Sequence, residues 1–314
     1  MFIHRKSYLI TFLLLVSIIS CEEDMTSYCD QYPNIIEIDE SIKVKRKVLI
    51  IGIDGFRSDA MQETITPFID SISRENNTYY TPYHIVEEYT WSGPNWSSIL
   101  NGVHIDKHNV KDNSFNDHNY NTYPPFFAYI KEADNNLNTA AIVNWTPINN
   151  FILSEFVDYA PIEPMNDSIV FENAKKVLID SSPLNPDIIF LHFDELDAAG
   201  HNYGFSPYIQ EYKNTLKTLD LYVENLFNII KQKRIKGEDW IIFIVSDHGG
   251  QGTGHSDTKN TNVNKTIFLA QHPYIKFKNN HTSNQTDLAP TILDFLGISS
   301  SIFNCKTDGI SLLQ

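Results

Sequence analysis

The sequence VLIIGID at residues 48–54 decides the class of fold. It is an uninterrupted apolar run of strand length that ends in an aspartate, as expected for a strand covered on both faces. Similar runs follow along the chain: NTAAIVNW (138–145), PDIIFLHFD (186–194), DWIIFIVSD (239–247) and TIFLAQ (266–271). The sequence therefore predicts a sheet whose strands are buried on both sides.

Segments with a helical pattern separate these runs. We expect helices over 65–73, 94–101, 119–133, 167–180, 206–233 and 285–298. Alternation of buried strands with helices indicates an α/β fold with a central, mostly parallel sheet and helices on both faces. The 314 residues and an apolar fraction of 42% are those of a globular protein, and we expect one catalytic domain over residues 46–314.

The N-terminus has the pattern of an export signal. Residues 1–20 combine a basic start with an apolar segment, which is typical of a signal peptide rather than a membrane span. The segment ends at Cys21, in a context that resembles the lipobox of bacterial lipoproteins. The resemblance implies lipidation of Cys21, a lipid-anchored tether over residues 21–45, and an exported protein at the outer membrane or cell surface, with the periplasm as the alternative. Cys29 and Cys305 then remain, and both a disulfide and two free thiols stay open.

The net charge limits the class of partner. The formal charge is −15, whereas binding a nucleic-acid polymer requires a basic surface. A small phosphorylated substrate stays possible, provided that the site contains its own cations. The sequence does not indicate an oligomeric state.

Acidic and histidine side chains follow three of the predicted strands. Asp54 follows the first run, and Asp197 and His201 follow the run that ends at residue 194. Asp247 and His248, and then His255, follow the run at 239–247. Because ligands bind beyond the carboxyl ends of the strands in such sheets, we expect these side chains to converge. Nitrogen and oxygen donors with little thiolate suit zinc or a similar divalent ion in an open catalytic site.

A hydroxyl-rich stretch, TWSGPNWSSILNGVHIDKHNV (90–110), contains the predicted helix 94–101, and Thr90 and Ser92 lie just before that helix. Its hydroxyl groups could cap that helix. One of them could instead be a nucleophile beside the free amides of the helix start, activated by a divalent cation. Two groups of metal ligands suggest a pair of ions, which can stabilise the attacking and the leaving oxygen of a displacement.

These motifs together resemble the alkaline phosphatase superfamily, in its type I phosphodiesterase/nucleotide pyrophosphatase branch. The matching pieces are IGIDGFRSD (51–59), the stretch at 90–110, DAAGHNYG (197–204), SDHGG (246–250), TDLAPTILDFLGI (286–298) and DGISL (308–312). They occur in the family's order and cover the chain from about residue 47 to its end.

The resemblance implies two zinc ions, although another divalent metal would fit the same donors. One ion would be bound by Asp197, His201 and a third histidine, and the other by Asp54, Asp247 and His248. Ser92 matches the family's nucleophile, with its oxygen between or beside the metals. Asn113 matches an asparagine that donates to a non-bridging phosphate oxygen. The implied reaction hydrolyses a phosphodiester or nucleotide pyrophosphate bond through a phospho-serine intermediate.

The third histidine ligand and the nucleophile each have alternative assignments. The third histidine is His255 in our interpretation, with His272 and His281 as alternatives. Thr90 is the alternative nucleophile. We expect Arg57, which follows the first strand, to be structural.

Other functions of the same superfamily also stay open. A phosphomonoesterase or a phosphoethanolamine-type transferase would use the same metals. A sulfatase is disfavoured, because Ser92-Gly93-Pro94-Asn95-Trp96 has tryptophan where the sulfatase motif has arginine. A non-catalytic surface lipoprotein that kept the fold is disfavoured by the complete set of ligands.

Overall fold

The computed structural model describes residues 45–153, 155–163, 165–303 and 306–314. These residues form a six-stranded sheet with the strand order β2-β6-β5-β1-β4-β3. The strands are β1 (Arg46–Ile53), β2 (Thr78–Ile85), β3 (Thr139–Val143), β4 (Ile188–Phe193), β5 (Asp239–Val245) and β6 (Lys265–Gln271). Strands β3, β4, β1 and β5 are parallel neighbours, while β6 is antiparallel to both β5 and β2. The prediction of a mostly parallel sheet is confirmed.

Each apolar run of the sequence forms a strand, but one strand was not predicted. Strand β2, with the sequence TYYTPYHI, has few aliphatic residues and a mixture of buried and exposed side chains. It lies at the edge of the sheet, where it pairs only with β6. Pro82 lies where the register between β2 and β6 shifts, which suits a residue without a backbone N–H group.

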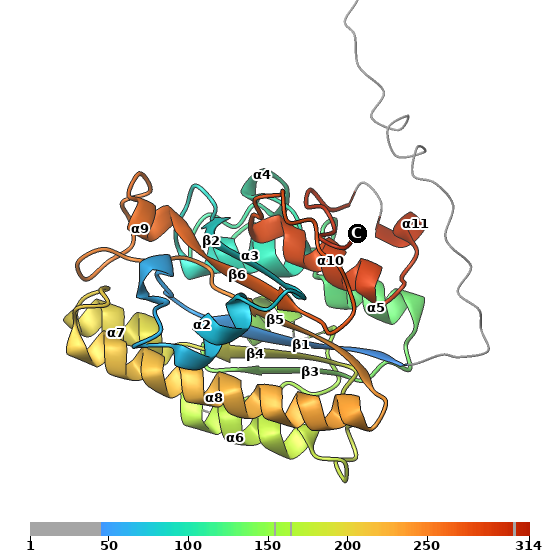
Figure 1. The fold of residues 1–314 in the computed structure, drawn as a ribbon. Helices are drawn as coiled ribbons and strands as arrows, with labels where there is room; N and C mark the ends of the chain where they lie inside the picture. Colours follow the sequence, from blue (N-terminus) through green and yellow to red (C-terminus); the bar gives the residue numbers. More distant parts are fainter. Residues whose placement is uncertain (1–44, 154, 164, 304–305) are drawn as a thin grey trace, which may run out of the picture. The chain divides into compact units, whose positions relative to one another are not determined.

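Helices cover both faces of the sheet. They are α2 (Pro67–Ser73), α3 (Ser92–Asn101), α4 (Ile105–His108), α5 (Phe126–Ala133), α6 (Asp167–Leu178), α7 (Glu195–Tyr203), α8 (Gln210–Ile235), α9 (Thr261–Asn264), α10 (Leu288–Phe295) and α11 (Ser300–Phe303). Short turns of 3-10 or π-helix add η2 (Ser58–Ala60), η3 (Ile148–Leu153) and η4 (Gln285–Asp287). Figure 1 shows α3, α5 and α10 on one side of the sheet and α2, α6 and α8 on the other.

The hydrophobic core is divided by the sheet into two parts. Val48 and Ile50 of β1 pack with α3, α5 and α10, whereas Leu49, Ile51 and Ile53 of the same strand pack with α2, α6 and α8. Alternate side chains of one strand therefore enter opposite cores. This double coverage explains why the strands read as continuous apolar runs.

The helices differ from the prediction in ways that bear on the site. The helix expected over 119–133 begins only at Phe126, because Pro124 and Pro125 disfavour a helical conformation in the residues before them. Helix α7 was not predicted; it begins directly after β4 and carries Asp197 and His201 one turn apart.

The predictions for the signal peptide, for Cys21 and the tether, and for Cys29 and Cys305 fall on residues outside those described. Within the described part of the chain, no helix has the length and apolarity needed to cross a membrane.

Candidate active site

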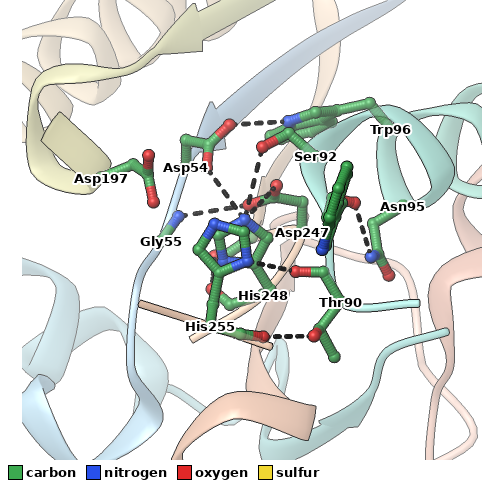
Figure 2. Close-up of polar contacts among 12 residues, drawn as sticks. Asp54, Gly55, Thr90, Ser92, Asn95, Trp96, Asp197, Asp247, His248 and His255 are labelled. Atoms are coloured by element: carbon green, nitrogen blue, oxygen red, sulfur yellow. Dashed lines mark hydrogen bonds and ion pairs between the residues drawn. The ribbon is translucent and has the colours of Figure 1, made fainter. Parts of the chain in front are cut away.

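The predicted ligands converge at the carboxyl ends of three adjacent strands. Asp54 follows β1, and Asp247 and His248 lie just beyond β5. Helix α7 presents Asp197 and His201 after β4, and His255 lies on the loop beyond β5. Figure 2 shows most of these side chains gathered around Ser92 and Thr90. The sheet therefore brings together residues that are up to two hundred positions apart in the sequence.

The first group of ligands surrounds the ring of His248. Its Nε2 atom lies 3.5 Å from Asp54 Oδ1 and 3.3 Å from Asp247 Oδ2. The three residues are fully buried, and their ligand atoms lie within 4.8 Å of one another. Side chains at this spacing could share one cation.

The second group lies beside the first. His201 Nε2 is 3.3 Å from Asp197 Oδ2 and 3.2 Å from His255 Nε2. The rings of His255 and His248 stack with centroids 4.0 Å apart, and the ligand atoms of Asp197, His248 and His255 also lie within 4.8 Å of one another. The two groups are thus contiguous, as a pair of neighbouring ions requires.

The hydrogen bonds of the three histidines decide which nitrogen faces the site. In each ring Nδ1 lies beside a backbone carbonyl: Gly249 for His248 (2.8 Å), Thr253 for His201 (3.0 Å) and Thr90 for His255 (2.6 Å). Because a carbonyl only accepts, Nδ1 carries the proton and donates it. All three rings therefore present the lone pair of Nε2 to the same space, which is how metal-binding histidines are oriented.

The carboxylates, like the three histidines, direct ligand atoms to the site. Three of their oxygens are buried without a hydrogen-bond donor in the part of the chain that the structure describes: Asp54 Oδ1, Asp197 Oδ1 and Asp247 Oδ2. Burial and the charges of Asp54 and Asp194 raise the pKa of Asp197 to about 9. Burial and the neighbouring Asp54 and Asp197 raise the pKa of Asp247 well above its ordinary value. The protein alone does not neutralise these carboxylates, so the donor set fits divalent cations.

Ser92 is the hydroxyl that faces this cluster. It is the first residue of α3, and its Oγ lies 3.4 Å from His248 Nε2. No side chain caps the start of α3; its N-cap residue is Trp91. The capping interpretation of this stretch is therefore wrong for the start of α3, and the hydroxyl of Ser92 faces the candidate metal ligands instead.

Thr90, the rival nucleophile, is engaged elsewhere. Its hydroxyl donates to the backbone carbonyl of His255, and its own carbonyl accepts from His255 Nδ1. The residue is almost fully buried. Thr90 thus contacts the ring and the backbone of His255 at once and orients this histidine.

The two rival histidines lie outside the cluster. His272 Nε2 is paired with Asp239 Oδ1 at 2.6 Å, at the opposite end of β5 from Asp247. His281 Nε2 is paired with Asp287 Oδ2 at 2.9 Å. Of the three candidates for the third histidine, the structure brings only His255 to the ligands.

Asn113 lies against the start of α3. Its Oδ1 accepts the backbone N–H of Gly93 at 2.8 Å, so its Nδ2 group remains the donor for another oxygen. A Cβ atom at Gly93 would lie 2.7 Å from the Asp112 carbonyl and 3.0 Å from Asn113 Oδ1. Only glycine at this position lets the loop approach the helix so closely.

Comparison with known proteins agrees with this arrangement. The sequence profile of the family described as type I phosphodiesterase / nucleotide pyrophosphatase matches residues 48–285, a range that includes every side chain of the cluster. The chain belongs to this family. Its place in the alkaline phosphatase superfamily follows.

Curated relatives of this phosphodiesterase/pyrophosphatase family member are longer proteins. Bis(5'-adenosyl)-triphosphatase ENPP4 of Bos taurus is 28% identical over 225 residues, which cover 65% of this chain and 47% of the relative. Ectonucleotide pyrophosphatase/phosphodiesterase family member 7 of Mus musculus is 26% identical over 233 residues, which cover 66% and 51% respectively. The chain thus spans about half the length of the curated relatives that it matches.

Solved structures share the fold of this family member. Murine ectonucleotide pyrophosphatase / phosphodiesterase 5 superposes with a TM-score of 0.65 at 18% identity, covering 85% of this chain and 100% of that one. A 2-O GAG sulfatase superposes with a TM-score of 0.67 at 16% identity, covering 85% and 73%. At these identities the likeness concerns the fold alone.

Some residues of the site were not predicted from the sequence. Trp96 and His192 both bond to Asp54 Oδ2. Gln285 donates to the carbonyl of Asp247 at 2.6 Å and lies 2.8 Å from His84 Nε2 through its Oε1. For Trp96 a signal existed, since it lies one helical turn after Ser92. For His192 the signal was a single histidine inside a buried strand.

The raised pKa values predict how pH affects the metal-free protein. Asp197 keeps its proton in the folded state up to about pH 9 but loses it near pH 4 when unfolded. Its stabilising contribution is therefore complete below pH 4 and is lost as the pH rises toward 9. Burial and the neighbouring His255 lower the pKa of His248 to about 3, so this ring is neutral in both states above pH 7 and does not oppose the trend.

We expect the melting temperature of chelator-treated protein to fall between pH 7 and 9. Asp197 alone contributes about 1.4 kcal/mol per pH unit below pH 8, or about 3 °C for a domain of this size. Thermal unfolding in a chelator across this range measures the slope. Asp197→Asn is the control and should reduce the slope to the part that comes from Asp247, whose pKa is also raised. A melting temperature that is constant or rises with pH would contradict the pKa assignment.

Proposed function

We propose that the protein is a two-zinc hydrolase of phosphodiester or nucleotide pyrophosphate bonds that acts through a phospho-serine intermediate. The observation that carries the proposal is the convergence of three histidine Nε2 atoms and three carboxylates, of which Asp54 and Asp247 are fully buried and Asp197 is partly buried, near Ser92 Oγ. Zinc suits this set because the donors are nitrogen and oxygen. Family membership and the name of the bovine relative, a bis(5'-adenosyl)-triphosphatase, support a small phosphorylated substrate.

The residues divide between two ions. Asp197, His201 and His255 would bind one, and Asp54, Asp247 and His248, with Ser92, would bind the other. When bound, the ions lower the pKa of the serine hydroxyl and neutralise charge on the attacking and leaving oxygens. Activity that is lost on chelation and restored by zinc, with two ions per chain by elemental analysis, is the result that tests the metal assignment.

The side chains then have separate roles. Ser92 Oγ attacks phosphorus, the bond from phosphorus to the leaving oxygen breaks, and the phosphoryl group is transferred to Ser92. Water attacks this phospho-serine in the second step and releases Ser92. Asn113 Nδ2 donates to a non-bridging oxygen, and because the amide is neutral it suits a diester, which carries less charge than a monoester.

Charge around the site favours a diester over a monoester. A monoester would need a cationic side chain for its additional charge, but the nearby candidates have other partners. Lys107 Nζ pairs with Asp308. Arg57 bonds to Asp59 and to the carbonyl of Phe205, as expected for a structural residue. Lys111 is exposed beside Asn113, and the structure gives it no contact with the ligands.

We expect the protein to cleave a chromogenic bis-ester faster than the mono-ester of the same chromophore. One missing charged hydrogen bond costs about 1.5–3 kcal/mol, or roughly 10–100-fold in kcat/KM. Both rates should be measured with the same zinc-loaded preparation, and Lys111→Ala controls for a contribution of that residue. A preference for the mono-ester would indicate a phosphomonoesterase instead of a phosphodiesterase. A screen of nucleotide, glycerophospho- and sugar-phosphate diesters would then identify the leaving group.

We also propose that Cys21 is lipidated and anchors the protein at the outer membrane or cell surface. The support is the signal pattern of residues 1–20 and the lipobox-like sequence before Cys21. Labelled palmitate should enter the wild-type protein but not the Cys21→Ala variant. Equal labelling of both would remove the proposal.

A further inference from the structure

One oxygen of the Asp54 carboxylate receives N–H groups from two different elements of the fold. The indole Nε1 of Trp96, in α3, lies 3.0 Å from Asp54 Oδ2, and Nε2 of His192, in β4, lies 3.2 Å from the same atom. All three side chains are fully buried. The other oxygen, Oδ1, has no hydrogen-bond partner among the described residues and faces His248. The two oxygens of one carboxylate thus have different surroundings.

His192 acts as a donor in this arrangement. The backbone N–H of Trp145 points at His192 Nδ1 from 3.5 Å, so Nδ1 provides the lone pair and Nε2 carries the proton. The ligand atoms of Asp54, His192 and Asp194 also lie within 4.8 Å of one another. A cation between them would need the lone pair of Nε2 and would meet the N–H of the indole. The hydrogen bonds therefore favour a support for Asp54 over a third ion.

The indole of Trp96 fits in the buried site because residue 52 is a glycine. A Cβ atom at Gly52 would lie 2.6 Å from Cη2 of Trp96 and 3.2 Å from the carbonyl of Leu191, so the ring lies directly on the glycine of β1. The indole also packs edge-on against Phe190 and His192, with centroids 5.8 and 4.9 Å away. These contacts leave the indole one position, with its N–H directed at Asp54.

We propose that Trp96 and His192 are positioning residues that hold Asp54 with Oδ1 toward the metal. Trp96 follows Ser92 by one turn of α3, so its indole also fixes the distance between the nucleophile and this carboxylate. This inference rests on the proposed metal site, and it concerns side chains that do not contact substrate. Groups that orient metal ligands in this way typically affect metal affinity or activity by about 10–100-fold when they are lost.

The test compares variants that lose an N–H donor with one that keeps a donor and one that changes packing alone. Trp96→Phe keeps an aromatic ring and removes the N–H group. His192→Leu removes the second donor, whereas His192→Gln retains an amide that can donate. Phe190→Leu is the matched control, because Phe190 packs on the same indole but has no polar contact with the site. For each full-length protein, zinc affinity is measured by competition with a chelator, together with kcat, KM and the melting temperature.

We expect Trp96→Phe and His192→Leu each to weaken zinc binding by about 10–100-fold and to lower kcat more than they raise KM. His192→Gln should recover most of the loss. Phe190→Leu should lower the melting temperature and leave zinc affinity within about threefold, since it removes packing alone. If Trp96→Phe does not fold, the comparison of His192→Leu with His192→Gln still tests whether a donor to Asp54 affects zinc binding.

Two results would overturn the inference while leaving the proposed function intact. In one, wild-type protein binds two zinc ions and is active, and the donor variants lose only thermal stability, as Phe190→Leu does. In the other, His192→Leu loses one of three bound ions per chain with kcat unchanged, which would make the group a separate cation site. A wild-type protein that binds no divalent cation would instead remove the proposed function, and this inference with it.

Discussion

Ser92→Ala should lower kcat on a bis-ester by a factor on the order of 1000 or more, because removing a nucleophile removes the covalent route altogether. Zinc should still bind, since Asp54, Asp247 and His248 all remain. The measurement is kcat beside metal content and chelator competition in the same preparation. A variant that is inactive and still binds zinc separates a lost nucleophile from a damaged metal site.

Thr90→Val is the matched control for this experiment. It removes the other hydroxyl of the stretch and with it the bond to the His255 carbonyl, which is worth about 1 kcal/mol, or less than tenfold in activity. Full activity in Ser92→Ala with none in Thr90→Val would make Thr90 the nucleophile. The mass of the peptide containing Ser92 adds a further check: a phosphoryl group supports the proposed intermediate, and loss of two hydrogens would indicate the oxidised residue of a sulfatase.

The sequence predicts most of the sheet because burial on both faces leaves a direct signal. Strands β1, β4 and β5 are apolar apart from Arg46, Lys47, His192 and Asp239, so their runs are clear. Strand β2 gives no such signal, since it lies at the edge and has a partly exposed face. Its pairing is determined by β6, almost two hundred residues away, and local patterns do not contain that information.

The same distinction applies to the site. The positions of Asp54, Asp247 and His248 follow from the topology, because carboxyl ends of parallel strands meet at one edge of the sheet. The support of Asp54 by Trp96 and His192 depends on the packing of α3 against β4. That contact joins residues almost a hundred positions apart, and no local spacing in the sequence relates them. The sequence therefore indicates the ligands and not the groups that orient them.

The third histidine ligand could not be identified from the sequence alone. His255, His272 and His281 lie within a short segment, and their spacing does not distinguish them. The choice depends on Thr90, which is 165 residues from His255 in the chain. Its carbonyl and hydroxyl fix both the ring and the backbone of His255. The ring of His248, from the other group of ligands, stacks on the ring of His255.

We therefore expect His255→Ala to lower kcat/KM on a bis-ester by a factor on the order of 100–1000 and to reduce bound zinc toward one ion per chain, because a ligand itself contributes more than the groups that orient it. His272→Ala is the matched control. It removes a buried partner of Asp239, so it should lower the melting temperature and leave kcat/KM and zinc content almost unchanged. If His255→Ala kept two zinc ions while His272→Ala or His281→Ala kept one, the histidine whose loss removes an ion would be the third histidine ligand. Since His272 lies at the opposite end of β5 from Asp247, that outcome would also require a different arrangement of the strand ends.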